Sequence, residues 1–414
     1  MATINDTHFC ALEGLRVLEI ASPLTSYCGK MFADMGADLV LIEPPGGCHM
    51  RREGPFVGSE PGLENSLTFA YHNTSKRGIT LDLNREEGRT IFRRLAETAD
   101  LILEGERPSI MDAHGLGWSD LCSRNRKLVI TSITPFGQTG PYSQYTSEDI
   151  VALAMGGLLY LGGYPDTAPN RVFGNQAFLC AAMYGAVAAM LGLTHAELTG
   201  KGQHIDVSMQ ECVVMAMETA VQSFDLEGEI RKRDAGKQRF AGTGVFQCKD
   251  GYIYMMAGGI GANKFWPNSL QWLIDEGVPG VERLAGAEWN DIEYLRSEKA
   301  KRIFSEVFAP WARQHNKSTL YHEGQRRHIP LAPINSVSDI VSSKQLEHRK
   351  YFVKVSHPGS TSPLVMPGAP YQFSVTPWRI GNRAPTLGEH TAEVLGSLGI
   401  TNDELAQLAG AGVL

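Results

Sequence analysis

The chain lacks any acidic residue between Asp166 and Glu197, although Asp and Glu make up 45 of its 414 residues. This interval contains the longest apolar stretch of the sequence, residues 177–193, which is rich in Ala and Gly. The missing carboxylates exclude an Asp or Glu nucleophile from this stretch. Because the stretch is near the lower length limit for crossing a bilayer, we expect a buried helix rather than a transmembrane one.

Cysteine pairs and clusters of basic residues are also missing. The seven cysteines are dispersed and form no Cys-x-x-Cys pair, which argues against a disulfide framework and a structural metal site. The net charge is −7 and Lys and Arg are spread along the chain, so nucleic-acid binding lacks the basic patch that it requires. The first residues have no apolar core typical of a signal peptide. We therefore expect a cytoplasmic protein that binds no metal, nucleic acid or membrane.

Strand and helix patterns alternate in the first part of the chain. Short apolar runs at 15–20, 37–43, 78–82, 99–104 and 128–133 are separated by segments with helical spacing, such as 26–35 and 85–97. This order is typical of a Rossmann-like parallel sheet. The length predicts two domains. We assign residues 1–223 to a large α/β domain, 224–325 to a smaller α+β domain, and 326–414 to a return into the large domain.

Six separate segments, in order, resemble one enzyme family, the class III CoA-transferases of the formyl-CoA and carnitine-CoA transferase type. The resemblance covers nearly the whole chain and implies that family's fold, assembled as an interlocked dimer. It also implies coenzyme A thioesters as substrates and no permanently bound cofactor. The segments are residues 34–47, 73–83, 99–108, 132–142, 330–335 and 387–391.

The resemblance also shows where this chain departs from the family. In the family, an aspartate at the start of the Ala- and Gly-rich helix accepts the acyl group, and Phe178 stands at that position here. A phenyl ring cannot act as a nucleophile. Related racemases use a His-Asp pair together with the same aspartate; the pair corresponds to Glu148 and Asp149 here, so racemase chemistry is disfavoured twice. Ala113 and Gly105 stand where some members carry an Arg and an Asn near CoA.

Two groups of candidate ligand-binding residues follow from the resemblance. The candidates for CoA phosphates are two pairs of basic residues. Lys76 and Arg77 could instead be a solvated pair at the start of a strand, and Arg51 and Arg52 an exposed pair in a loop. The candidates for the thioester are residues of two Gly-rich loops, which would otherwise be ordinary turns. We interpret His204 and Asp206, in the strand after that helix, as structural. The candidates are Lys76, Arg77, Arg51 and Arg52 for CoA, and Phe136, Gly137, Gln138, Tyr142, Gly258 and Gly259 for the substrate pocket.

Three functions remain open. The first is a non-catalytic subunit of a heteromeric CoA-transferase, whose homologous partner chain supplies the aspartate. It would move CoA between an acyl-CoA, such as succinyl-CoA, and a carboxylic acid, such as benzylsuccinate in toluene degradation. The second is a CoA-ester isomerase or lyase that uses another group. The third is a CoA-binding regulatory protein.

Overall fold

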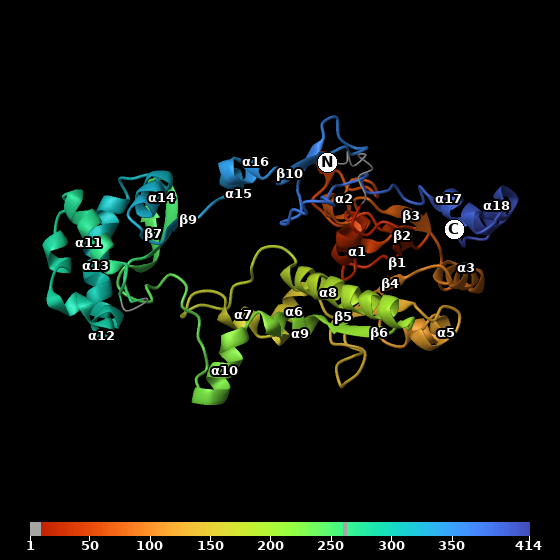
Figure 1. Ribbon diagram of the computed structural model, residues 1–414, viewed down its shortest axis with the longest axis horizontal. Helices are drawn as coiled ribbons and strands as arrows, with labels where there is room; N and C mark the ends of the chain where they lie inside the picture. Colours follow the sequence, from red (N-terminus) through yellow and green to blue (C-terminus); the bar gives the residue numbers. More distant parts are fainter. Residues whose placement is uncertain (1–9, 260–262) are drawn as a thin grey trace, which may run out of the picture. The chain divides into compact units, whose positions relative to one another are not determined.

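The structure, a computed structural model, describes residues 10–259 and 263–414, and the chain divides into two compact units. The large unit comprises 1–160, 171–231 and 347–414; the small unit comprises 161–170 and 232–346. These boundaries differ from 224 and 325, the positions predicted from the sequence. Helix α10 (Glu218–Glu227; Figure 1) belongs to the large unit, whereas residues 161–170 and 326–346 belong to the small one.

A six-stranded sheet forms the centre of the large unit, and all its neighbouring strands are parallel, as the sequence predicts. The strand order β3-β2-β1-β4-β5-β6 is the doubly wound Rossmann order, which reverses between β1 and β4. Most strand residues are buried, which explains the continuous apolar runs in the sequence. The strands are β1 (Arg16–Ile20), β2 (Asp38–Glu43), β3 (Arg77–Thr80), β4 (Leu101–Glu104), β5 (Val129–Thr134) and β6 (His204–Ser208).

Helices cover both faces of this sheet. On one face, α1 (Ser26–Ala33) and α8 (Gln176–Thr199) share a core with the strands. On the other face, α3 (Glu86–Ala96) and α17 (Thr391–Ser397) form a second core. The remaining helices and strands of the large unit are η1 (His49–Arg52), η2 (Val57–Ser59), α2 (Leu67–His72), α4 (Ile110–Ala113), α5 (Trp118–Cys122), α6 (Asp149–Met155), α9 (Met209–Met215), α16 (Lys344–His348, which spans the boundary), β10 (Phe352–Val355), β11 (Leu364–Pro367) and α18 (Asn402–Gly410).

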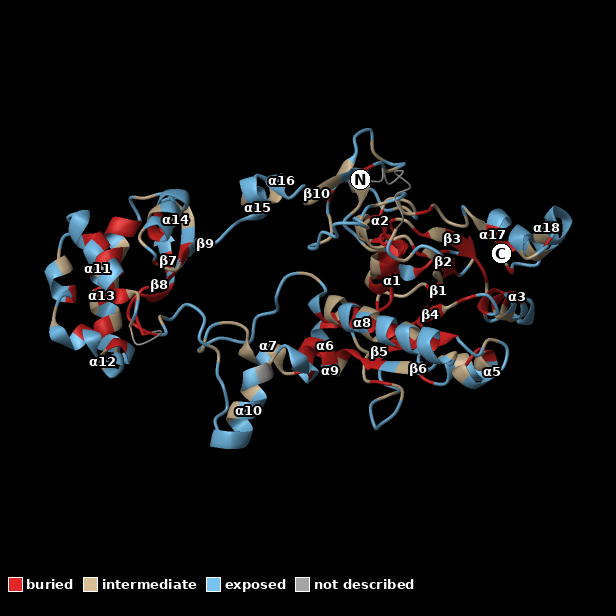
Figure 2. Ribbon diagram, viewed as in Figure 1, coloured by how far each residue is buried: buried red, intermediate tan, exposed pale blue. Residues whose placement is uncertain are grey.

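Helix α8 approaches the sheet closely because the residues that face it are small. A Cβ atom on Gly185 would lie 2.5 Å from Ile133 Cδ1, and one on Gly192 would lie 2.7 Å from Ile205 Cδ1. The prediction of a buried helix is wrong for the opposite face. There the large apolar side chains of α8 are exposed within this chain (Figure 2).

The small unit has its own antiparallel sheet and an aromatic core. Strands β7 (Thr243–Cys248), β8 (Gly251–Met256) and β9 (Leu331–Pro333) pair in sequence order. Trp266 and Trp289 stack with ring centroids 4.9 Å apart, and the buried Trp272 belongs to the same core. The helices are α11 (Trp266–Asp275), η3 (Val281–Leu284), η4 (Ala287–Asn290), α12 (Ile292–Arg296), α13 (Glu298–Ala312), α14 (Lys317–Arg326) and α15 (Val337–Val341), while α7 (Leu158–Leu161) spans the unit boundary.

Candidate functional site

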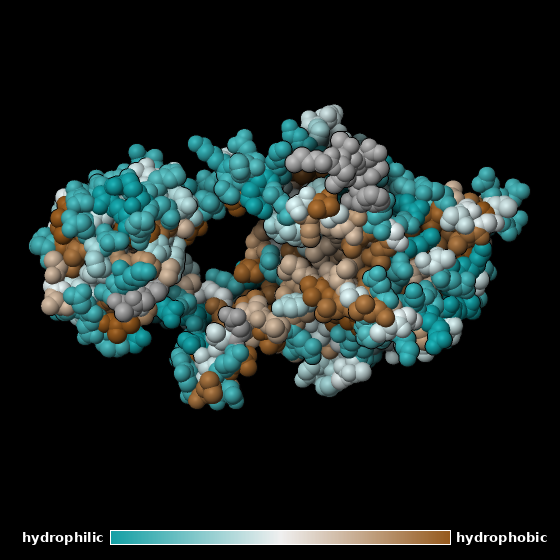
Figure 3. Space-filling view, viewed as in Figure 1, coloured by the Kyte–Doolittle hydropathy of each residue, from teal (hydrophilic) through white to brown (hydrophobic). Residues whose placement is uncertain are grey.

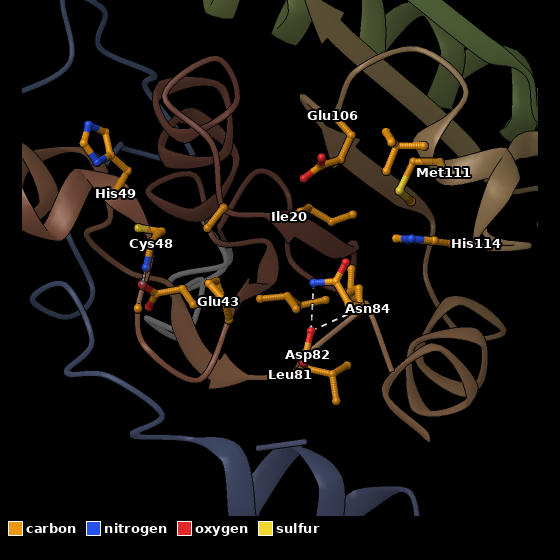
Figure 4. Close-up of a pocket in the computed structure, with 16 residues that line it drawn as sticks. Ile20, Glu43, Cys48, His49, Leu81, Asp82, Asn84, Glu106, Met111 and His114 are labelled. Carbon is orange, nitrogen blue, oxygen red and sulfur yellow. Dashed lines mark hydrogen bonds between the residues drawn. The ribbon is translucent and has the colours of Figure 1, made fainter. Parts of the chain in front are cut away.

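A pocket of about 330 Å³ opens at the carboxyl ends of β1 to β4, where the strand order reverses. Ligands of open α/β sheets bind at this place. Its walls include Ile20, Leu81 and Met111, which offer apolar surface to a flat ring. Figure 4 shows Glu106, Met111 and His114 on one side of the pocket in this view, and Cys48 and His49 on the other.

The polar groups of this pocket suit a nucleoside better than a phosphate. Asp82 and Glu106 bring carboxylates, whereas the Glu43 carboxylate is buried and bonded to Arg51, and the lining residues include no Lys or Arg. Carboxylates accept hydrogen bonds from ribose hydroxyls and amino groups, but they repel phosphates. Phosphate contacts would therefore depend on basic residues at the rim.

Lys76 does not supply such a contact, because it is buried in an ion pair. Its Nζ lies 2.7 Å from Glu19 Oε2 and 2.8 Å from both Ser26 O and Asn73 Oδ1, and its side chain is inaccessible. Burial raises the pKa of Glu19 even though Lys76 opposes the shift. The geometry assigns Lys76 to the core of the large unit, not to the phosphate-binding role predicted from the sequence.

Arg51 is buried in the same way. Its Nε and Nη2 donate to the two oxygens of Glu43 at 2.7 and 2.8 Å, and Nη1 donates to Glu64 at 2.8 Å. Its guanidinium also lies over the Phe69 ring, 3.8 Å from the centroid. Each nitrogen of the Arg51 guanidinium has a partner within the protein, which points against the predicted contact with CoA. Arg51 instead stabilises the loop after β2.

Arg77 and Arg52 remain accessible to a ligand. Arg77 is partly exposed and pairs with Asp38 at 2.5 Å and Glu393 at 2.9 Å. Arg52 is exposed and donates to the carbonyl groups of Gly46, Gly47 and Cys48. Since Gly47 and Cys48 line the pocket, Arg52 stands at its rim. Of the four predicted basic residues, Arg52 is placed best for a phosphate.

The predicted substrate loop after β5 is anchored to β6. Gly137 has a φ of +85°, and the N–H of Gln138 donates to both carboxylate oxygens of Asp206, at 3.1 and 2.9 Å. Phe136 contacts Tyr142 edge to face, with ring centroids 6.1 Å apart. Asp206 thus fixes this loop, a positioning role that agrees with the structural interpretation of this residue. His204 pairs with Ser132, Nε2 to Oγ, at 2.8 Å.

The other predicted substrate loop, at Gly258 and Gly259, follows β8 in the small unit. The Gly258 carbonyl accepts from Thr243 Oγ1 at 2.7 Å, and the N–H of Gly259 donates to Asn263 Oδ1 at 3.0 Å. Gly259 has a φ of +77°, which explains the residue type. The rest of the predicted motif, Ile260 and Gly261, lies outside the described residues. The substrate role of this loop stays a prediction.

Phe178 lies in the first turn of α8, where a carboxylate from another helix reaches it. Asp149 Oδ1, at the start of α6, accepts from the N–H groups of Ala177 at 2.7 Å and Phe178 at 3.4 Å. Its other oxygen, Oδ2, is buried and has no hydrogen-bond partner in the described part of the chain. Desolvation raises the pKa of Asp149, against the effect of these two hydrogen bonds. The Phe178 ring packs against the core between α8 and the sheet.

This arrangement of Asp149 was not predicted from the sequence, which associated the residue only with the His-Asp pair of racemases. Twenty-nine positions separate it from Phe178, and only the folding of α6 against α8 joins them. The one signal in the sequence was an acidic residue at the start of an apolar helical segment, a pattern typical of helix starts in general.

A second buried carboxylate, Glu104, ends β4 and lines a neighbouring cavity of about 250 Å³. It accepts from the N–H of Glu106 at 2.7 Å. Burial raises the pKa of Glu104 to about 7. A raised pKa means that the folded state disfavours the ionised form. The stability tied to the protonated form is fully present below the unfolded pKa near 4.5, and is lost as the pH rises to about 7.

Glu104→Gln is therefore expected to stabilise the large unit relative to the natural chain at pH 8, by up to about 3 kcal/mol. Glutamine keeps an acceptor for the Glu106 N–H and removes the cost of a buried charge. The difference in free energy of unfolding between the variant and the natural chain should narrow as the pH falls from 8 to 5. Urea unfolding at several pH values measures this difference. A difference independent of pH would assign the effect to altered packing instead.

Comparisons of the chain with known proteins identify one family. The model of CoA-transferase family III matches residues 12–391. The chain is 38% identical to the succinyl-CoA:(R)-benzylsuccinate CoA-transferase subunit BbsE of Thauera aromatica, over 96% of this chain and 97% of that one. It is 28% identical to the succinyl-CoA–L-malate CoA-transferase beta subunit of Chloroflexus aurantiacus, over 96% of both chains.

Solved structures agree with these matches. A CAIB/BAIF family protein from Brucella suis superposes with a TM-score of 0.80 at 27% identity, covering 94% of this chain and 99% of that one. The family model, the relatives and the doubly wound sheet with its switch-point pocket lead to the same assignment. The chain belongs to CoA-transferase family III.

Proposed function

We propose that this chain is the non-catalytic subunit of a heteromeric CoA-transferase, and that a homologous partner chain carries the acyl-accepting aspartate. The observation that carries the proposal is Phe178 at the first turn of α8. This ring is partly buried against the core, so no ionisable side chain stands at the family's nucleophile position. The name of the Thauera relative, which describes a subunit, supports the heteromer.

The names of the same relatives support the substrates that we propose. The Thauera and Chloroflexus proteins are both named for succinyl-CoA as donor, and the more similar one is named for benzylsuccinate as acceptor. We infer a cytoplasmic enzyme that transfers CoA from succinyl-CoA to an aryl-substituted dicarboxylic acid. In this chain the nucleoside part of CoA would be held by the switch-point pocket, with Arg52 at its rim.

One observation favours a second candidate, a chain that catalyses CoA-ester chemistry with another group. Asp149 Oδ2 is buried, has no hydrogen-bond partner among the described residues, and lies in the carboxylate bonded to the Phe178 N–H. A carboxylate so placed could attack a thioester carbonyl, expel the CoA thiolate and become an acyl anhydride. We favour a helix-capping role, because the other oxygen is held by two backbone N–H groups of α8.

One experiment distinguishes the two candidate functions. The chain is incubated alone with succinyl-CoA, and its intact mass is recorded by mass spectrometry, beside the co-expressed pair. The subunit proposal expects no acyl or CoA adduct on this chain and an adduct on its partner. An adduct on this chain that Asp149→Asn abolishes would establish the second candidate, and would overturn the non-catalytic assignment.

A further inference from the structure

A cleft of about 710 Å³ lies in the large unit, between β10 with its flanking residues and the segment 378–383. Its volume falls in the range of small-molecule sites, about 300–1,000 Å³. The cleft shares no lining residue with the switch-point pocket, so it is a separate cavity. In Figure 3 the visible surface over α16 and the start of β10 is hydrophilic, in contrast to the apolar surface over α8. We call this cavity the basic cleft.

Positive charge dominates the lining of the basic cleft. Four of the lining side chains are basic and none is acidic, although the whole chain has a net charge of −7. Arg383 is neutralised by Glu389, whose two carboxylate oxygens accept from its Nη1 and Nη2 at 2.9 and 3.0 Å. Lys350, Lys354 and Arg379 form no ion pair within the part of the chain that the structure describes. Three uncompensated cations therefore line one cavity.

One wall of the basic cleft is anchored to the core of the large unit. The Gly381 N–H donates to Ser75 Oγ, and the Ser75 N–H donates to Asn382 O, both at 2.9 Å. Ser75 Oγ in turn donates to the buried carboxylate of Asp34 at 2.6 Å. A wall that is fixed before a ligand arrives loses less conformational entropy on binding, which favours a built site over a loose surface patch.

Trp378 supplies a flat apolar surface to the same cleft. Gly368, which follows β11, allows this ring to approach closely, since a Cβ atom there would lie 3.1 Å from Trp378 Cζ3. The Gly368 N–H donates to Tyr351 O at 2.8 Å, so the ring packs against the paired strands β10 and β11. Part of the ring stays exposed. Flat heteroaromatic rings such as nucleobases stack on a surface of this kind.

We propose that the basic cleft binds a nucleoside diphosphate, whose phosphates contact Lys350, Lys354 and Arg379 and whose base stacks on Trp378. A diphosphate carries about three negative charges at neutral pH, which matches the three unpaired cations. A dicarboxylate would leave one of these cations unpaired. The site is independent of the proposed function, because the basic cleft and the switch-point pocket share no residue.

The experiment measures the Kd of ADP for the full-length chain by isothermal titration calorimetry in EDTA, with and without excess CoA. Lys350→Ala/Lys354→Ala should raise this Kd by roughly 10- to 100-fold, because two charge-assisted hydrogen bonds are lost. Both side chains are exposed, so the fold should survive, which circular dichroism checks. Excess CoA should leave the Kd of ADP unchanged, because CoA does not occupy the basic cleft.

Lys127→Ala/Lys201→Ala is the matched control. Both lysines are exposed in the large unit and line neither cavity, so this variant removes the same charge and should bind ADP like the natural chain. If it weakened ADP binding as much as the variant in the cleft, the attraction would be non-specific, and the inference would fail.

Trp378→Leu tests the stacking of the base. It should raise the Kd of ADP by at least roughly 5-fold and leave the Kd of inorganic pyrophosphate unchanged, because pyrophosphate has no ring to stack. Unchanged pyrophosphate binding also shows that the cleft is intact in this variant. An equal effect on both probes would contradict the nucleoside part of the assignment.

Other results would also overturn the inference. One is the absence of measurable ADP binding to the natural chain. Displacement of ADP by CoA, together with weaker ADP binding in Arg52→Gln, would place the nucleotide in the switch-point pocket instead. Tighter binding of benzylsuccinate than of ADP, lost in Lys350→Ala/Lys354→Ala, would make the basic cleft a site for an aryl dicarboxylate.

Discussion

Purified alone, the chain is expected to transfer no detectable CoA from succinyl-CoA to benzylsuccinate, whereas the co-expressed pair should be active. Each half-reaction needs a carboxylate that carries the acyl group and then CoA, and the first turn of α8 offers a phenyl ring instead. Replacement of the partner's corresponding aspartate by asparagine should abolish the activity of the pair. Release of free CoA and formation of the new thioester, followed by liquid chromatography, measure the transfer.

Phe178→Asp in the isolated chain should restore little of this activity. The Phe178 ring packs against the core, and the new carboxylate would belong to the residue whose N–H donates to Asp149 of α6, so the two like charges would disfavour each other. Removal of a single preorganised oxyanion donor already costs about 10²–10³-fold in rate, so a nucleophile without such a pocket gains little. Phe178→Asn is the control, since it removes the ring and adds no nucleophile. Activity of Phe178→Asp close to that of the pair would show that the site is otherwise intact, contrary to the subunit proposal.

The alternation of apolar strands and helical segments sufficed to predict the sheet. Parallel strands buried on both faces leave continuous apolar runs, and these runs appear in the sequence at β1, β2, β4 and β5. The same reasoning failed for α8. A helix rich in Ala and Gly looks buried by composition, but one of its faces is exposed within this chain, and composition does not show which face is covered.

The roles of the basic residues were harder to predict, because a Lys or Arg has the same local pattern in a core as at a phosphate. Glu19, the partner of Lys76, lies 57 positions away, and Pro385, whose carbonyl accepts from Arg51, lies 334 positions away. Such contacts depend on the tertiary fold. The same holds for Asp149, which meets Phe178 only after α6 packs against α8.

Lys76→Met is expected to destabilise the large unit by about 3–5 kcal/mol, because it leaves Glu19 buried without its counter-charge. Both side chains are inaccessible, and Lys76 Nζ also bonds to Ser26 O and Asn73 Oδ1, so three acceptors lose their donor at once. The double variant Lys76→Met/Glu19→Gln should recover much of this loss, since it removes the uncompensated charge. Urea unfolding of the co-expressed pair, followed by tryptophan fluorescence and by hydrogen exchange at β1 and β3, measures the change.

The same variants distinguish a core lysine from a phosphate ligand. Where the fold persists, Lys76→Met should leave the Kd for CoA unchanged, because Nζ points into the core. Arg52→Gln is the matched comparison: Arg52 is exposed beside the pocket, so its loss should weaken CoA binding and change stability by less than about 1 kcal/mol. If Lys76→Met kept full stability and lost CoA affinity, Lys76 would be the phosphate ligand that the family resemblance implies, and its ion pair with Glu19 would have to open when CoA binds.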